Sequence, residues 1–128
     1  MIEISRGMID HYLCFITDGW FDNDPDEPAE ELTKYYEYVI RIKQDAVNRN
    51  DLEYFRLGIE YLLCHPEISL ENHGNVYGWD DDEVREIIVY IRSVIWSDNL
   101  DINCEEVKDV QLVNTNRFDW WEMRKVKA

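Results

Sequence analysis

The feature that most constrains this chain is an acidic helix start followed by an aliphatic stripe. Gly78-Trp79-Asp80-Asp81-Asp82-Glu83 places four carboxylates where a helix has free N–H groups and the positive end of its dipole. The residues that follow repeat with the spacing of one helical face: Val84, Ile87, Ile88, Ile91, Val94 and Ile95. The opposite side is polar: Arg85, Glu86, Arg92 and Ser93. We therefore expect a helix that runs to Trp96 and forms the centre of the core.

Three other segments, 4–17, 28–48 and 51–64, also show helical periodicity. Pro66 ends the last of them, because proline cannot continue a helix. The turn Asn48-Arg49-Asn50 is short, so 28–48 and 51–64 should form an antiparallel helical hairpin. Asn50 or Asp51 is suited to cap the second helix.

The C-terminal segment permits two interpretations. Residues 107–113 are rich in β-branched residues, and 117–126 could return as a second strand after the turn Asn114-Thr115-Asn116. Alternatively, 117–126 is a short helix capped by Thr115 or Asn116. The clustered β-branched and aromatic residues favour a small antiparallel β-hairpin. The predicted fold is mainly α (α+β), with about four helices and this C-terminal hairpin in a single domain, 1–128.

The size and composition are those of a globular protein. The chain has 128 residues, of which 45% are hydrophobic and 13% aromatic, and this is enough for one core. No apolar run approaches the roughly 20 residues that span a bilayer. The first residues, Met1-Ile2-Glu3-Ile4-Ser5-Arg6, lack the pattern of a signal peptide. We expect a cytoplasmic protein that does not bind membranes.

The cysteines do not follow a disulfide or zinc pattern. Cys14, Cys64 and Cys104 are an odd number, are far apart and contain no C-x-x-C pair. The sequence therefore predicts three reduced, structural thiols.

No motif predicts catalysis, a cofactor or a metal. The glycines are scattered, so there is no phosphate-binding loop, and the chain lacks G-x-S-x-G and H-E-x-x-H. Asp22-Asn23-Asp24-Pro25-Asp26 imitates the opening of a calcium loop, but Glu27 and Thr33 stand where Gly and a bidentate Glu are needed. His11 is expected at the surface or its rim. We expect no enzyme, no cofactor and no metal site.

The net charge is the outlier. Lys and Arg total 13 against 28 Asp and Glu, which gives −15 and a pI near 4.4. A charge this negative disfavours direct binding to nucleic acid or anionic lipid, and it accelerates association with basic proteins. The competing interpretation is that acidity only keeps the protein soluble.

In size and charge the chain is similar to small acidic immunity proteins of bacterial toxin systems, and more loosely to phage inhibitors that mimic DNA. This likeness implies a protein-binding inhibitor that neutralises a basic partner, most concretely a bacterial nuclease toxin. It carries over no residue roles, because no motif is shared. A DNA-mimic antagonist or a non-catalytic adaptor is the alternative.

The expected partner-binding residues come from two acidic clusters, Asp18–Glu31 and Asp80–Glu83, and from the tryptophans beside them. An aromatic anchor within a charged rim is common in tight interfaces. The set is Trp20, Asp22, Asp24, Asp26, Glu27, Trp79, Asp80, Asp81 and Asp82.

Overall fold

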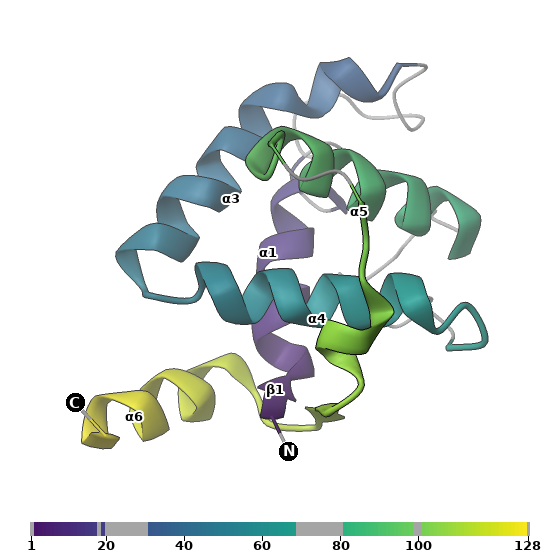
Figure 1. The fold of residues 1–128 in the computed structure, drawn as a ribbon. Helices are drawn as coiled ribbons and strands as arrows, with labels where there is room; N and C mark the ends of the chain where they lie inside the picture. Colours follow the sequence, from purple (N-terminus) through teal and green to yellow (C-terminus); the bar gives the residue numbers. More distant parts are fainter. Residues whose placement is uncertain (1, 18, 20–30, 69–80, 99–100, 128) are drawn as a thin grey trace.

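The computed structural model describes residues 2–17, 19, 31–68, 81–98 and 101–127, and these are mainly helical (Figure 1). The helices are α1 (Arg6–Thr17), α3 (Tyr36–Asn48), α4 (Leu52–Cys64), α5 (Asp81–Ile95) and α6 (Arg117–Lys127). Two 3-10 turns, η1 (Leu32–Tyr35) and η2 (Cys104–Val107), and two short strands, β1 (Ile2–Ser5) and β2 (Val110–Val113), complete the described elements.

The mainly α class is confirmed, and so are helices in the segments 51–64 and 84–96; the segment 28–48, predicted as one helix, is the 3-10 turn η1 followed by α3, and its first residues lie outside the described ranges. Helices α3 and α4 are joined by a tight turn in which Asn50 takes a positive φ of 59°. Asparagine is among the few residues other than glycine that adopt this conformation readily. Asp51 occupies the N-cap position of α4, but its side chain makes no capping hydrogen bond. The prediction that Asp51 caps this helix is therefore wrong, and its carboxylate has another role, described below.

The N-terminal helix begins later than predicted. Residues 2–5 form β1, and the Ser5 hydroxyl receives a hydrogen bond from the Met8 backbone N–H at 3.1 Å, as an N-cap does. The same hydroxyl donates to the backbone carbonyl of Thr115. Ser5 thus ends the strand, starts α1 and joins both to the C-terminal part of the chain.

The predicted antiparallel hairpin is wrong. β2 pairs in parallel with β1, from Ile2 opposite Val110 to Ser5 opposite Val113. Residues 117–127 form α6, so the alternative of a short helix is confirmed. Asn116 caps it: its side-chain oxygen accepts from the Asp119 N–H at 2.9 Å, and its amide donates to the Asp119 carboxylate at 3.0 Å. The β-branched run did form a strand, but its partner lies at the other end of the chain.

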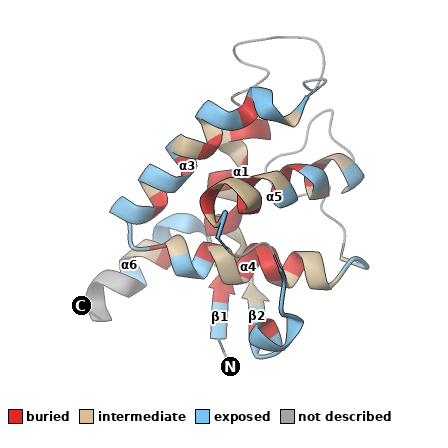
Figure 2. Cartoon of the chain, turned by 45° about the horizontal axis from the view of Figure 1, so that its top comes forward, coloured by how far each residue is buried: buried red, intermediate tan, exposed pale blue. Residues whose placement is uncertain are grey.

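Helix α1 lies at the centre of the molecule, behind α4 and α5 in the view of Figure 1. Its inner residues Met8, Ile9, Tyr12, Leu13 and Ile16 are completely buried. The aliphatic stripe of α5 joins them in one core, which confirms its predicted inward direction for these residues: Val84, Ile87, Ile88, Ile91 and Ile95. Figure 2 shows the buried residues on the sides of the helices that face one another.

Two glycines allow α1 to approach its neighbours closely. A Cβ atom on Gly58 of α4 would lie 2.6 Å from the Ile9 Cδ1 atom. A Cβ on Gly7 would lie 2.8 Å from the backbone of Thr115 and of Arg117, and the Gly7 N–H donates to the Thr115 carbonyl at 3.3 Å. Gly7 weakens the helix as an isolated segment, but the contact with 115–117 requires it.

The cysteines also depart from the prediction. Cys64, at the end of α4, forms a disulfide with Cys104 of η2, with the Cα atoms 5.9 Å apart, while Cys14 is not part of a disulfide. The prediction of three reduced thiols is therefore wrong. The two bonded residues are 40 positions apart, so no local spacing indicated the pair. Among the described residues, no helix is long and apolar enough to cross a membrane.

Candidate partner-binding surface

Most of the predicted partner-binding residues lie outside the part of the chain that the structure describes. These are Trp20, Asp22, Asp24, Asp26, Glu27, Trp79 and Asp80, and the calcium-loop-like run belongs to the same range. Asp81 and Asp82 are described, and they are the first two residues of α5. Asp81 is partly buried and Asp82 is exposed. The carboxylates of this first turn lie at the positive end of the helix dipole, as predicted.

Arg85 lies among these carboxylates in sequence, but its guanidinium turns toward the end of α4. It donates to the backbone carbonyls of Leu62 and Ile68, both at 2.8 Å, and of Pro66 at 3.1 Å. The last carbonyls of a helix lack partners within the helix and carry a partial negative charge, so an arginine stabilises them well. The positive charge of Arg85 is therefore directed to the backbone and not to the solvent side of α5.

The second arginine of α5 is also turned inward. Arg92 is 4% exposed, which contradicts the prediction that it lies on the polar outer side. Its Nε atom lies 3.5 Å from the carboxylate of the buried Glu60, and its Nη2 donates to the Asp101 carbonyl at 2.8 Å. The i, i+3, i+4 pattern places Arg92 beside the aliphatic stripe. That Glu60 faces Arg92 depends on the position of α4, which the pattern does not give.

Glu60 is shared with Arg56 of the same helix. The Arg56 Nη1 atom lies 2.9 Å from Glu60 and 3.3 Å from Glu106, and Arg56 also pairs with Glu53. The pKa of Arg56 is raised, most by its hydrogen bond to Glu53, and the Glu60 carboxylate adds to this effect. The network ties α4 to α5 and to η2. Sequence reasoning did not identify it, because Glu60 occupies a position that the stripe of α4 does not distinguish from a surface site.

The inward arginines change the charge that a partner meets. Arg56, Arg85 and Arg92 are occupied by carboxylates of α4 and η2, among them the buried Glu60, and by backbone carbonyls. Asp82 and Glu86, on the outer side of α5, are exposed and form no ion pair within the described ranges. The outer side of this helix therefore carries carboxylates without a compensating cation of its own, and it attracts cationic groups at long range.

A buried carboxylate at the α3–α4 turn holds the C-terminal helix. Asp51 is fully buried and accepts hydrogen bonds from the Tyr12 hydroxyl at 2.6 Å, the Trp120 indole at 3.1 Å and the Trp121 indole at 2.7 Å. All three partners are neutral donors, and a carboxylate offers enough lone pairs to satisfy them. This arrangement joins α1, α4 and α6, so its clearest role is structural.

His11 lies beside this cluster. Its Nε2 atom is 3.0 Å from the Asp45 carboxylate, which also pairs with Arg49 at 3.0 Å, and the Arg49 guanidinium lies over the Trp121 ring. Burial lowers the pKa of His11, and the hydrogen bond to Asp45 partly offsets this. The side chain is 18% exposed, so its predicted place at the rim is confirmed.

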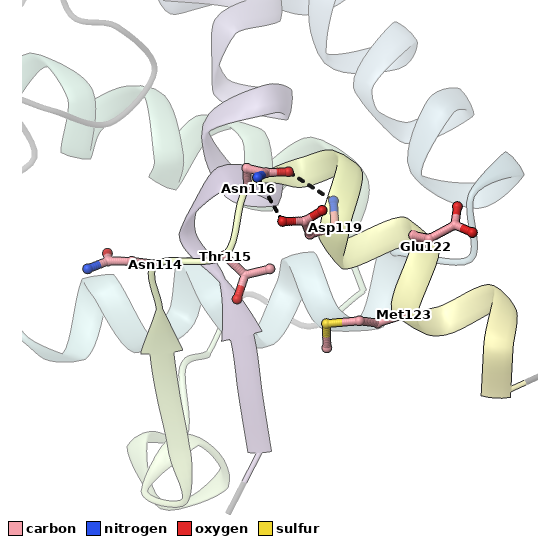
Figure 3. Close-up of a pocket in the computed structure, with 6 residues that line it drawn as sticks. All are labelled: Asn114, Thr115, Asn116, Asp119, Glu122 and Met123. Carbon is pink, nitrogen blue, oxygen red and sulfur yellow. Dashed lines mark hydrogen bonds between the residues drawn. The ribbon is translucent and has the colours of Figure 1, made fainter.

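An open pocket of about 510 Å³ lies at the start of α6 (Figure 3). Its lining comes from the segment after β2 and from the first turns of α6: Asn114, Thr115, Asn116, Asp119, Glu122 and Met123. Figure 3 shows that Asn116 and Asp119 are bonded to each other and complete the helix cap. The side chains of these two lining residues are thus engaged in the helix cap.

Within the described ranges, no three His, Cys, Asp or Glu side chains are close enough to hold a metal ion. Comparison with known proteins finds no matching family model, no matching curated protein and no matching solved structure.

Proposed function

We propose that this protein is an acidic protein-binding inhibitor, most concretely an immunity protein that binds and neutralises a basic bacterial nuclease toxin. The observation that carries the proposal is the inward direction of Arg85 and Arg92 while Asp82 and Glu86 remain exposed on the same helix. Both arginines have structural partners inside the fold, and their inward direction leaves the outer carboxylates of α5 without a cation of the same helix.

The mechanism follows from charge. A nuclease binds its substrate through Lys and Arg side chains that contact phosphates. Carboxylates presented on a rigid helix can pair with those side chains and exclude the nucleic acid. Long-range attraction accelerates the encounter, and the rate falls as salt screens the charges.

The test has two stages. The immobilised protein is incubated with bacterial lysate at about 50 mM and at about 500 mM salt, with and without added duplex DNA. The proteins that it captures are identified by mass spectrometry. A captured basic protein is then purified, and its nuclease activity is titrated with the inhibitor. Stoichiometric inhibition of one nuclease supports the proposal.

Two results would contradict it. Capture of many DNA-binding proteins that are all displaced by duplex DNA would favour a DNA mimic. A captured partner that shows no nuclease activity, or whose activity is not inhibited, would favour an adaptor. The two results differ in the DNA competition and in the activity assay, so they cannot be confused.

A further inference from the structure

The outer side of α5 forms one continuous strip. At 100° per residue, positions 82, 86, 89 and 93 fall on one side of the helix, opposite the buried stripe. Asp82 and Glu86 are exposed, Val89 is 52% exposed, and Ser93 is partly buried. The strip thus changes from acidic at the start of α5 to apolar in its middle.

Aromatic side chains from two helices extend the apolar part. Tyr36, at the start of α3, is 48% exposed, and Tyr90 of α5 follows Val89 on the side of the strip away from Arg92. The pKa of Tyr90 is raised by burial and, to a lesser degree, by the nearby Tyr36 phenol, which places the two rings in the same neighbourhood. Helices α3 and α5 contact each other, which agrees with Tyr36 lying near Tyr90, and Val89 precedes Tyr90 on the exposed strip; these three residues are called the patch below.

We infer that this surface, the acidic strip of α5 with the patch of Tyr36, Val89 and Tyr90, is where a basic protein partner docks. The inference rests on the proposed function and names its contact surface. Tyrosine is enriched among the residues that contribute most to binding, and charged rims around apolar anchors set specificity. The expected partner presents an apolar side chain to the patch, with Lys or Arg beside it for Asp82 and Glu86.

Charge decides between this partner and a second copy of the chain. A second copy carries the same net charge of −15, and like charges oppose contact between two copies. Lys34 of η1 and Lys43 of α3 are exposed, whereas the exposed residues of the α5 strip include no cation.

The test uses the whole protein and a defined probe. The probe is a short synthetic peptide with leucine and tryptophan at its centre and lysines on both sides. Amide chemical-shift changes in a two-dimensional NMR titration locate it. We expect the largest changes at residues 36, 82, 86, 89 and 90, small changes for a lysine-only peptide, and none for a peptide with glutamate in place of lysine.

Matched variants sharpen the result. Val89→Arg places a cation in the patch and should weaken peptide binding about tenfold or more, whereas Val89→Ala should change it less than about threefold. Asp82→Asn with Glu86→Gln should weaken it several-fold at low salt. Glu3→Gln with Asp109→Asn removes the same charge from exposed sites near β1 and β2, and should have little effect.

Shift changes spread evenly over the acidic surface, or equal effects of the two double variants, would mean electrostatic attraction only and would overturn the inference. Concentration-dependent changes at 36, 89 and 90 without peptide would show a second copy as the occupant and would also overturn it. Inhibition of a captured nuclease that Val89→Arg leaves intact would reject this surface while retaining the proposed function. Peptide binding at the patch without any inhibited nuclease would reject the proposed function instead.

Discussion

The Asp51 carboxylate and the Trp121 indole are 70 residues apart in the chain, and a hydrogen bond of 2.7 Å joins them. With the bond from Trp120, this contact attaches α6 to the turn between α3 and α4, and the Tyr12 hydroxyl of α1 donates to the same carboxylate. Within the described side chains of α6, Trp120 is buried but Phe118 is 65% exposed, so apolar burial secures only part of this helix. Asp51 is therefore a buried acceptor shared by both tryptophans of α6, and the Arg49 guanidinium over the Trp121 ring adds to the attachment.

Replacing that acceptor should destabilise the protein. In Asp51→Asn one oxygen becomes an amide that cannot accept, so at least one of the three donors loses its partner. We expect a loss of about 2 kcal/mol in the free energy of unfolding, and a larger loss for Asp51→Ala. Urea unfolding followed by tryptophan fluorescence measures it. Asp109→Asn, an exposed control, should change stability by less than about 0.5 kcal/mol. Equal stability of the two variants would contradict the assigned role.

Replacing Glu60, the buried acid between two arginines, should lower the free energy of unfolding far more than replacing Glu53, an exposed acid that binds one of them. Glu60 is 1% exposed and lies between Arg56 and Arg92, so Glu60→Gln leaves buried positive charge without its counter-ion. We expect a loss of about 3 kcal/mol. Glu53→Gln, which removes a 65% exposed partner of Arg56, should cost about 0.5 kcal/mol or less. Thermal and urea unfolding of both variants compare them, and similar losses would show that the buried pair is not special.

The disulfide should contribute measurable stability. Cys64–Cys104 closes a loop of 40 positions and attaches η2 to α4, so its reduction increases the freedom of the unfolded chain. We expect a reducing agent to lower the free energy of unfolding by about 2–4 kcal/mol. A variant with Cys64→Ser and Cys104→Ser should show the lower stability with and without reductant. Cys14→Ser should retain the response to reductant. If the response were lost in that variant, Cys14 and not the Cys64–Cys104 disulfide would be its source.

Stability should decrease as the pH falls below the ordinary pKa of histidine. Burial lowers the pKa of His11 from 6.5 in the folded state, so the unfolded chain takes up the proton first. The unfolded state then binds more protons, and stability is lost as the pH falls from 6.5 through the folded-state pKa. His11→Gln should flatten this part of the profile. Unfolding midpoints measured between about pH 5 and pH 7.5 check it, and identical slopes for both proteins would exclude His11 as the source.

Local patterns were sufficient to predict most of the helices. The stripe of Val84, Ile87, Ile88 and Ile91 indicated the direction in which α5 faces, because an apolar face must be buried whatever covers it. The turn after Asn48 and the stop near Pro66 followed from backbone chemistry, which acts within a few residues. The charge of −15, which supports the proposed function, is also a property of the sequence alone.

The tertiary structure decided what depends on distant partners. Val110–Val113 has strand propensity, but only its pairing with Ile2–Ser5 in the folded chain makes the sheet parallel and its partner strand N-terminal. The same is true of the Cys64–Cys104 bond and of Asp51, which resembles a helix cap in sequence and serves as a buried acceptor in the fold. Arg85 and Arg92 resemble solvent-facing cations until α4 lies beside them. Periodicity reports which face of an element is apolar, whereas pairing of polar groups depends on which elements meet, and that is fixed only when the whole chain has packed.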